Sequence, residues 1–320
     1  MKLPTVEQLE DAARVVYQVL QPTPQICWPL LAERCGAEVW VKHENHLPTG
    51  SFKVRGGLVY AKHVQTMTPR PTGVIAATRG NHGQSVAYSA ARNRLRAVIV
   101  VPHGNNPDKN AAMRAYGAEL VEQGRDFQDA YEYAQAQAAE RGLTLFPSFH
   151  ELLVSGVASY GLELFRAVAD LDTVYVPVGL GSGICAVIAA REALKMRTKI
   201  VGAVSAQAPT YALSFEARRA VRTVSSDTMA DGLAVRVPDD TALAIIMRHA
   251  ERLVAVPDDE IEAAIRHYFS DTHNVAEGAA AATLAALLRE RDLMRGKRVG
   301  LVLTGCNIER GMFARILSAA

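Results

Sequence analysis

Two hydrophobic patterns alternate along the chain. Short apolar runs, most of them without polar alternation, predict strands that are covered on both faces of a parallel sheet. These expected strands are residues 38–42, 73–77, 97–101, 118–122, 173–178, 199–204, 252–256 and 298–304. Between them, apolar residues recur every three or four positions and predict helices, among them 127–141, 184–196 and 261–268. This alternation predicts an α/β fold with helices on both faces of parallel sheets.

Length, charge and cysteine content narrow the class of protein. A chain of 320 residues is long enough for about two domains. The net charge is +2, and no lysine and arginine stripe is interleaved with aromatic residues, which argues against a nucleic-acid partner. No apolar run of about 18 residues occurs, so no membrane span is expected. The four cysteines lack metal-ligand spacing, so no metal site is expected; their small number and the absence of a signal peptide indicate a cytoplasmic protein.

Ligands of open parallel sheets bind beyond the carboxyl ends of the strands, so the loops that follow the strands are candidate sites. In the first loop Pro48 to Gly50 forms a turn, and Ser51 is expected to cap a helix that begins near Phe52. Lys53 then lies in the first helical turn, where the helix dipole disfavours a cation. This position indicates a lysine that gives up its proton, as a Schiff-base lysine must. The alternative is a solvated surface lysine.

The second candidate loop follows the expected strand at residues 73–77. It reads Thr78-Arg79-Gly80-Asn81-His82-Gly83. Its glycines flank hydroxyl, amide and imidazole groups at the start of an expected helix, and such a loop presents backbone N–H groups to an anion. The alternative is a helix start whose polar side chains only satisfy the backbone.

Glycines dominate the third candidate loop, which follows residues 173–178. It reads Gly179-Leu180-Gly181-Ser182-Gly183. Glycines let the backbone wrap a phosphate, and the following helix supplies positive potential. Ile184 stands where a dinucleotide fingerprint needs its third glycine, so a compact phosphate site or a packing turn is favoured. The fourth loop begins at Thr304, whose hydroxyl is expected at the carboxyl end of the last strand; read alone, it is an ordinary turn.

Taken in order, these loops resemble the fold type II pyridoxal-phosphate enzymes, which include the threonine and serine dehydratases and serine racemase. The most specific match is Lys42-x-Glu44 followed by Pro48-Thr49-Gly50-Ser51-Phe52-Lys53-x-Arg55-Gly56. Further matches are Tyr116-Gly117-Ala118-Glu119, Ala230-Asp231-Gly232-Leu233 and Glu277-Gly278-Ala279. The resemblance implies two α/β domains of the tryptophan synthase β-like type with the cofactor between them. Residues 1–50 and 149–320 would form the large cofactor-binding domain, and residues 51–148 the small mobile domain.

The resemblance also implies a role for each loop. Lys53 would hold pyridoxal 5'-phosphate as a Schiff base and, once released, would remove the α-proton of the substrate. The loop from Gly179 to Gly183 would bind the phosphate of the cofactor, Thr304 its pyridine nitrogen and Asn81 its phenolic oxygen. The groups expected to bind the substrate are Ser51, Thr78, Arg79, Gly80, Asn81 and His82.

The reaction implied by the resemblance is α-proton removal and β-elimination of water, which converts a β-hydroxy amino acid such as L-threonine or L-serine to a 2-oxo acid and ammonia. A neutral Thr304 hydroxyl leaves the pyridine ring a weaker electron sink, which suits such an elimination. Phenylserine and 3-hydroxyaspartate are the alternative substrates. Racemisation is disfavoured because Arg79 replaces a family serine, and β-replacement because Asn81-His82 stands where Asn-Thr is expected. A protein that only binds amino acids would not need the Lys53 amine.

Three further expectations concern partners. Arg79 can bind an anion, either a side-chain carboxylate of the substrate or a phosphate oxygen of the cofactor. Residues 204–209 contain no carboxylate, so we expect no activating magnesium or calcium ion there. Members of the family are dimers or tetramers, so we expect a homo-oligomer that takes a small amino-acid substrate. Only a short segment follows Asn307, so no appended regulatory domain is expected.

Overall fold

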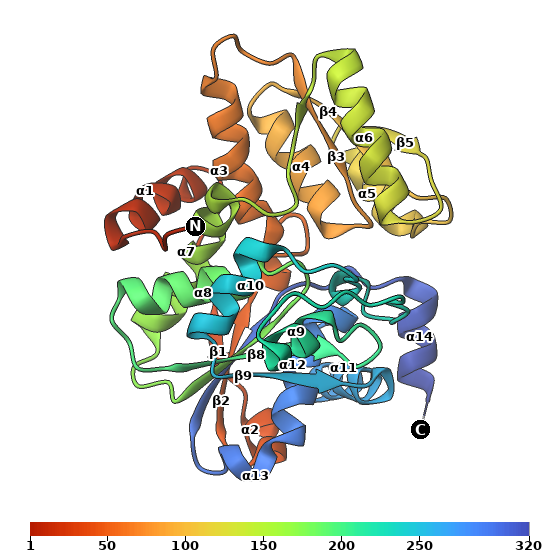
Figure 1. Cartoon of the computed structure of the whole chain (residues 1–320). Helices are drawn as coiled ribbons and strands as arrows, with labels where there is room; N and C mark the ends of the chain where they lie inside the picture. The colour runs from red at the N-terminus through yellow and green to blue at the C-terminus, as the bar shows by residue number, and fades with distance from the viewer. Residues whose placement is uncertain (320) are drawn as a thin grey trace.

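The computed structural model describes residues 1–319 and contains two β-sheets, which lie one above the other in Figure 1. The lower sheet has six strands in the order β1-β2-β10-β7-β8-β9. Only β1 runs antiparallel to its neighbour. The strands are β1 (Gln25–Cys27), β2 (Glu38–His43), β10 (Arg298–Leu303), β7 (Thr173–Pro177), β8 (Lys199–Ser205) and β9 (Arg252–Val256).

The upper sheet has four parallel strands in the order β5-β4-β3-β6. They are β5 (Glu119–Glu122), β4 (Arg96–Val101), β3 (Gly73–Ala77) and β6 (Thr144–Leu145). Along β3, Val74 packs in the apolar cluster of α4 (Asn81–Arg92), whereas Ile75 packs in the cluster of α6 (Phe127–Arg141). Helices therefore cover both faces, which is why the strand needs no polar alternation.

Helices also cover both faces of the six-stranded sheet. One face packs against α7 (Glu151–Ala167), α8 (Ser182–Ala193) and α10 (Asp240–His249). The other packs against α2 (Pro29–Cys35), α11 (Asp258–Thr272) and α12 (Gly278–Arg289). The remaining helices are α1 (Val6–Tyr17), α3 (Lys53–Thr66), α5 (Pro107–Ala115), α9 (Thr210–Ala217), α13 (Arg291–Met294) and α14 (Arg310–Ser318), with short 3-10 turns η1 (Glu44–His46) and η2 (Asp231–Leu233).

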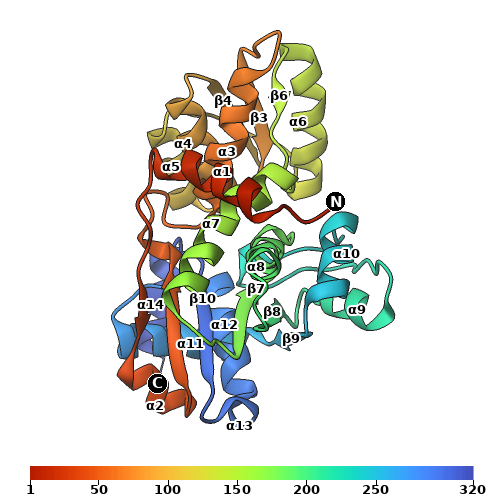
Figure 2. The same cartoon turned by 90° about the vertical axis from the view of Figure 1, so that its left-hand side faces the viewer.

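One helix joins the two halves of the molecule. Helix α7 packs against α3 of the upper half and against α8 of the lower half, and α1 packs across both α7 and α3 (Figure 2). Within residues 1–319, every helix is too short or too polar to cross a membrane.

The strands expected from the sequence are all present, with ends that agree to within one residue. Helix α6 has the expected bounds. Helix α1 begins with a capping box, in which the side chains of Thr5 and Gln8 each accept a backbone N–H of the other. Strands β1 and β6 were not expected, because runs of three and two residues carry no readable periodicity.

The expected helix cap at Ser51 is wrong. Helix α3 begins at Lys53, Phe52 is its capping residue, and the cap makes no side-chain hydrogen bond. The backbone of Ser51 instead forms an isolated bridge with Gly305, and its buried hydroxyl has no hydrogen-bond partner among the described residues. A pairing with the far end of the chain therefore overrides the local capping preference.

Candidate active site

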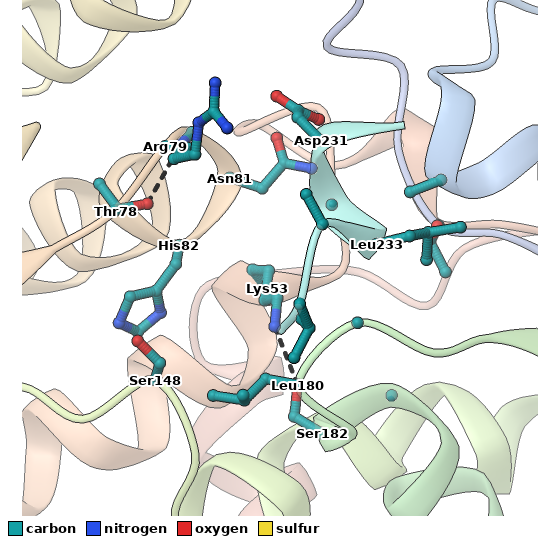
Figure 3. Close-up of a pocket in the computed structure, with 18 of the residues that line it drawn as sticks. Lys53, Thr78, Arg79, Asn81, His82, Ser148, Leu180, Ser182, Asp231 and Leu233 are labelled. Carbon is teal, nitrogen blue, oxygen red and sulfur yellow. Dashed lines mark hydrogen bonds between the residues drawn. The ribbon is translucent and has the colours of Figure 1, made fainter. Parts of the chain in front are cut away.

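Loops of both sheets line one cavity of about 170 Å³. Its walls include the residues that follow β3, β7 and β10, together with the start of α3. Parallel strands bring the loops at their carboxyl ends together, so segments far apart in sequence converge here. In Figure 3, Lys53 lies between the loop that carries Thr78 to His82 and the loop that carries Leu180 and Ser182.

Lys53 is a cavity lysine that forms no ion pair within the described residues, unlike Lys109, which pairs with Asp231. Its Nζ donates a hydrogen bond to Ser182 Oγ at 2.9 Å. Burial lowers the pKa of Lys53 to about 8, although the nearby Glu277 carboxylate acts in the opposite direction. The position at the first residue of α3 adds the unfavourable positive end of the helix dipole. The neutral amine is therefore accessible near neutral pH, and the alternative of a solvated surface lysine does not hold.

Backbone hydrogen bonds dock the Lys53 turn onto the loop after β10. The N–H of Phe52 donates to the Thr304 carbonyl at 3.0 Å, and the N–H of Cys306 donates to the Gly50 carbonyl at 2.9 Å. Thr304 itself is buried and lines the cavity. The positions of Lys53 and Thr304 are consequently fixed relative to each other by main chain alone.

The loop from Gly179 to Gly183 forms the opposite wall of the cavity and leads into α8. A Cβ at Gly179 would lie 2.1 Å from the Gly232 carbonyl oxygen, so only glycine fits there. Gly181 caps the helix at φ +102° without a side-chain hydrogen bond. The first N–H groups of a helix lack partners within it, so those of α8 can serve an anion bound at this loop.

The loop from Thr78 to His82 faces the cavity from the upper sheet (Figure 3). The Thr78 hydroxyl accepts hydrogen bonds from the N–H groups of Gly80 at 3.0 Å and Gly83 at 3.2 Å, which fixes the loop. Burial lowers the pKa of His82 to about 3, helped by the charge of Lys53, so its imidazole is neutral. His82 Nε2 has no hydrogen-bond partner among the described residues.

Two predicted residues lie apart from the centre of the cavity. Arg79 is exposed at the rim, and in Figure 3 its guanidinium points away from Lys53. Ser51 is fully buried and does not line the cavity. The predicted substrate contact of Ser51 stays a prediction, and these positions give it no support.

Sequence reasoning assigned no chemistry to three charged residues of the cavity. Lys109 on α5 pairs with Asp231 of η2 at 2.5 Å, which connects the two halves of the molecule across the cavity. Glu277, which precedes α12, is buried, and its Oε1 accepts a hydrogen bond from Asn81 Nδ2 at 2.7 Å. Asp231 and Glu277 lie in motifs that match the family. The sequence around each of them does not indicate that it lines this cavity, because only the tertiary fold brings these segments together.

These features define a class of site. A half-buried lysine of lowered pKa faces a glycine loop at a helix N-terminus, in a cavity lined by loops of both sheets. Such a site suits a cofactor that carries both a phosphate and an aldehyde. The sequence matches the family model "Pyridoxal-phosphate dependent enzyme" over residues 16–305. The chain belongs to this family, and its cofactor is pyridoxal phosphate.

Similar proteins include both enzymes and solved structures. The chain is 33% identical to the L-threonine ammonia-lyase of Thermotoga maritima over 315 residues, which cover 98% of this chain and 78% of that protein. It is 29% identical to the L-threo-3-hydroxyaspartate ammonia-lyase of Saccharomyces cerevisiae, over 99% of this chain and 98% of that protein. The structure of processed threonine deaminase isoform 2 from Solanum lycopersicum matches with a TM-score of 0.90 at 27% identity, covering 99% of this chain and 95% of that one.

Proposed function

We propose that this protein is a pyridoxal-phosphate dependent ammonia-lyase that converts a β-hydroxy amino acid, such as L-threonine or L-serine, to a 2-oxo acid and ammonia. The observation that carries the proposal is the half-buried Lys53 amine, whose pKa is lowered to about 8 beside the glycine loop. The names of the similar ammonia-lyases and threonine deaminase support the same reaction.

The residues of the cavity fit the cofactor. Lys53 would hold it covalently, the backbone from Gly179 to Gly183 would bind its phosphate, and Thr304 would contact its pyridine nitrogen through a neutral hydroxyl. Asn81 would hydrogen-bond its phenolic oxygen. A Cβ at Gly179 would collide with the Gly232 carbonyl oxygen, so the loop can pack this closely only with glycine at this position. Such close backbone packing is what a compact phosphate-binding loop requires. When bound, pyridoxal phosphate withdraws electrons from the substrate Cα and so makes the α-proton acidic.

Proton transfer falls to Lys53. Its neutral amine can take the α-proton, because burial has already removed most of the preference for the ammonium form. The hydroxyl of Ser182 accepts the N–H of Lys53 and holds the amine on the side of the glycine loop. We infer that this contact orients the amine between successive proton transfers.

The loop from Thr78 to His82 would bind the α-carboxylate. It runs into α4, which begins at Asn81 and whose N-terminal N–H groups and dipole favour a negative charge. The neutral imidazole of His82 would add a hydrogen bond but no charge. The Thr78 hydroxyl already serves the backbone of its own loop, so its contribution is to keep these donors in place.

We further propose that residues 51–148 act as the small mobile domain and residues 1–50 with 149–320 as the large one. The four-stranded sheet falls wholly within the first range and the six-stranded sheet within the second. The Lys109–Asp231 pair would then link the two across the cavity mouth. The predicted self-association and location of the chain stay predictions.

A second candidate substrate is a 3-hydroxyaspartate. Arg79 is a cation on the rim of the cavity and forms no ion pair within the described residues. A guanidinium in this place suits a substrate with a second carboxylate. The similarity to the L-threo-3-hydroxyaspartate ammonia-lyase of Saccharomyces cerevisiae agrees with this alternative.

A substrate panel separates these possibilities. The purified protein is loaded with pyridoxal phosphate and offered L-threonine, L-serine, phenylserine and 3-hydroxyaspartate, while 2-oxo acid and ammonia are measured. We expect at least one of these amino acids to yield a 2-oxo acid and ammonia in equal amounts. If only 3-hydroxyaspartate yields these products, the second candidate substrate is selected.

The control is Lys53→Ala in the same assay. We expect it to reduce kcat by at least about 10³-fold and to abolish the absorption band of the Schiff base between lysine and cofactor. Cofactor binding without release of a 2-oxo acid from any member of the panel would overturn the dehydratase proposal and leave the family assignment intact.

A further inference from the structure

A chain of hydrogen bonds runs behind the cavity from the Lys53 turn to Glu277. Asn307 Nδ2 donates to the Thr49 carbonyl at 2.8 Å and to Asn81 Oδ1 at 2.8 Å. Asn81 Nδ2 then donates to Glu277 Oε1 at 2.7 Å. These four residues, Thr49, Asn307, Asn81 and Glu277, are called the amide chain below. It connects the loop after β10 with the loop after β3 and with the start of α12.

The direction of the amide chain is set at one end. A backbone carbonyl such as that of Thr49 can only accept, so the side of Asn307 that faces it must be the NH₂ group. The second hydrogen of this NH₂ group requires an acceptor, so Asn81 must turn its Oδ1 toward Asn307. The NH₂ group of Asn81 is then left for Glu277 and for the cavity.

Asn307 cannot move easily away from this arrangement. Thr49 is buried, and a Cβ at Gly50 would lie 2.6 Å from Asn307 Oδ1, so the turn closes tightly on the amide. Asn81 and Glu277 line the cavity, whereas Asn307 does not. Any influence of Asn307 on a bound molecule must therefore pass through a neighbour, either Asn81 or the Thr49 turn that leads to Lys53, and a double-mutant cycle with Asn81 separates these two routes.

We propose that Asn307 is a positioning residue of the active site: it fixes the orientation of the Asn81 side-chain amide, so that Asn81 presents an N–H donor, and never its carbonyl oxygen, to the cavity. The inference rests on the proposed function through the cofactor contact of Asn81. A donor at this place suits an oxygen anion such as a phenolate, whereas a flipped amide would repel it.

The amide chain also determines where Glu277 carries a proton. Its Oε1 accepts from Asn81, while its buried Oε2 has no partner among the described residues. Burial raises the pKa of Glu277 to about 7, against the attraction of Lys109. A proton on this carboxyl group must therefore reside on Oε2, because Oε1 faces a donor.

A double-mutant cycle on the full chain tests the proposal. The dissociation constant of pyridoxal phosphate is measured for wild type, Asn307→Ala, Asn81→Ala and the double variant. Asn307→Ala frees the Asn81 amide and is expected to weaken binding about tenfold, the effect of roughly one hydrogen bond. In the Asn81→Ala background the same change is expected to alter binding less than twofold, because the group through which it acts is gone.

Two comparisons separate positioning from general stability. Asn274 is a matched control: its Nδ2 donates to the Thr272 carbonyl, its Oδ1 accepts from Asn45 Nδ2, and it does not line the cavity. Asn274→Ala should leave cofactor binding unchanged. Asn307→Asp should bind worse than Asn307→Ala, because its carboxylate places acceptor oxygens against the Thr49 carbonyl and Asn81 Oδ1, whereas alanine only removes the donor.

The proposal is overturned if Asn307→Ala binds pyridoxal phosphate as wild type does, or weakens binding equally with and without Asn81. The second result would mean that Asn307 only supports the fold, and the midpoint of urea unfolding should fall in parallel. These outcomes concern cofactor binding, so they are distinct from failure of the proposed reaction, in which bound cofactor would yield no 2-oxo acid from any substrate.

Discussion

The two loops that face Lys53 are built in opposite ways. Both follow a strand and lead into a helix. The loop from Gly179 to Gly183 is dominated by glycine, and its backbone packs so closely that a Cβ at Gly179 would overlap Gly232. The loop from Thr78 to His82 carries hydroxyl, guanidinium, amide and imidazole groups, and a side chain fixes its shape.

This difference follows from what each loop would bind. A phosphate is the same in every turnover and can be held by backbone N–H groups at a helix N-terminus. The second loop would hold the α-carboxylate that all amino acids share, and it also carries Arg79, a side chain that can distinguish one substrate from another. We therefore expect changes in the glycine loop to act on cofactor binding, and changes in the other loop, apart from Asn81 with its proposed cofactor contact, to act on KM.

The largest effect on cofactor affinity is expected for Gly179→Ala. The added Cβ would lie 2.1 Å from a backbone oxygen, so the loop must move rather than a flexible side chain. We expect pyridoxal phosphate to bind about 100-fold more weakly, which corresponds to roughly 3 kcal/mol. Equilibrium titration of the visible absorption measures this change.

Gly311→Ala is the control for that substitution. A Cβ at Gly311 would meet its nearest neighbour at an ordinary 3.6 Å, on an exposed helix away from the cavity. It should leave the affinity for pyridoxal phosphate unchanged. If Gly179→Ala bound the cofactor within twofold of wild type, the contrast between the two loops would be wrong.

Lys53 lies between the two loops and belongs to neither. Replacing it should change the unfolding free energy of the cofactor-free protein. Burial holds its pKa near 8, below the unfolded value of 10.5, so the unfolded chain binds more protons between these two pH values. Below pH 8 the half-buried ammonium group lowers the free energy of unfolding by its full amount. This destabilisation disappears as the pH rises to 10.5. Cofactor-free Lys53→Met should therefore exceed wild type in free energy of unfolding by ~1–3 kcal/mol at pH 7.

Urea denaturation at pH 7 and at pH 10 measures this difference. Lys62→Met, which changes an exposed lysine of the same helix, is the control and should alter the unfolding free energy little at either pH. A Lys53→Met protein less stable than wild type at pH 7 would show that the amine is not held in an unfavourable environment.

Thr78→Val sharpens the comparison from the side of the substrate loop. It keeps the shape of the side chain but removes the acceptor for the N–H groups of Gly80 and Gly83. We expect KM to rise about tenfold while cofactor affinity stays within twofold, because an unsatisfied N–H costs about 1–2 kcal/mol. Steady-state kinetics measure KM, and Thr78→Ser, which keeps the hydroxyl, should retain most of the wild-type value.

How much of this could be predicted from sequence depends on how local each feature is. The strands were readable because buried parallel strands are continuous apolar runs, and the four candidate loops because they follow such strands. The position of Lys53 in the first turn of α3 was also local. The cap at Ser51 failed because the backbone of this residue pairs with Gly305, 254 positions away in the chain.

The hydrogen bonds between the loops could not be predicted from sequence, because they also join residues that are far apart in the chain. Asn307, Asn81 and Glu277 come from segments that no local pattern relates, and each contributes through a hydrogen bond formed by folding. The motif around Glu277 indicated a resemblance but no chemistry. Sequence patterns therefore locate loops at strand ends, whereas the polar contacts between loops need the tertiary structure.

Arg79→Ala is expected to have the smallest effect and to decide between the two candidate substrates. The guanidinium is exposed and points away from Lys53, so kcat/KM for L-threonine should change less than twofold (Figure 3). For a 3-hydroxyaspartate, loss of an exposed ion pair should lower kcat/KM by up to about fivefold, since such pairs contribute at most about 1 kcal/mol. Arg79→Lys, which keeps the charge, should restore most of that loss. An equal loss for both substrates would instead place Arg79 on the shared α-carboxylate, and the side-chain distinction assigned to this loop would then have to come from other residues.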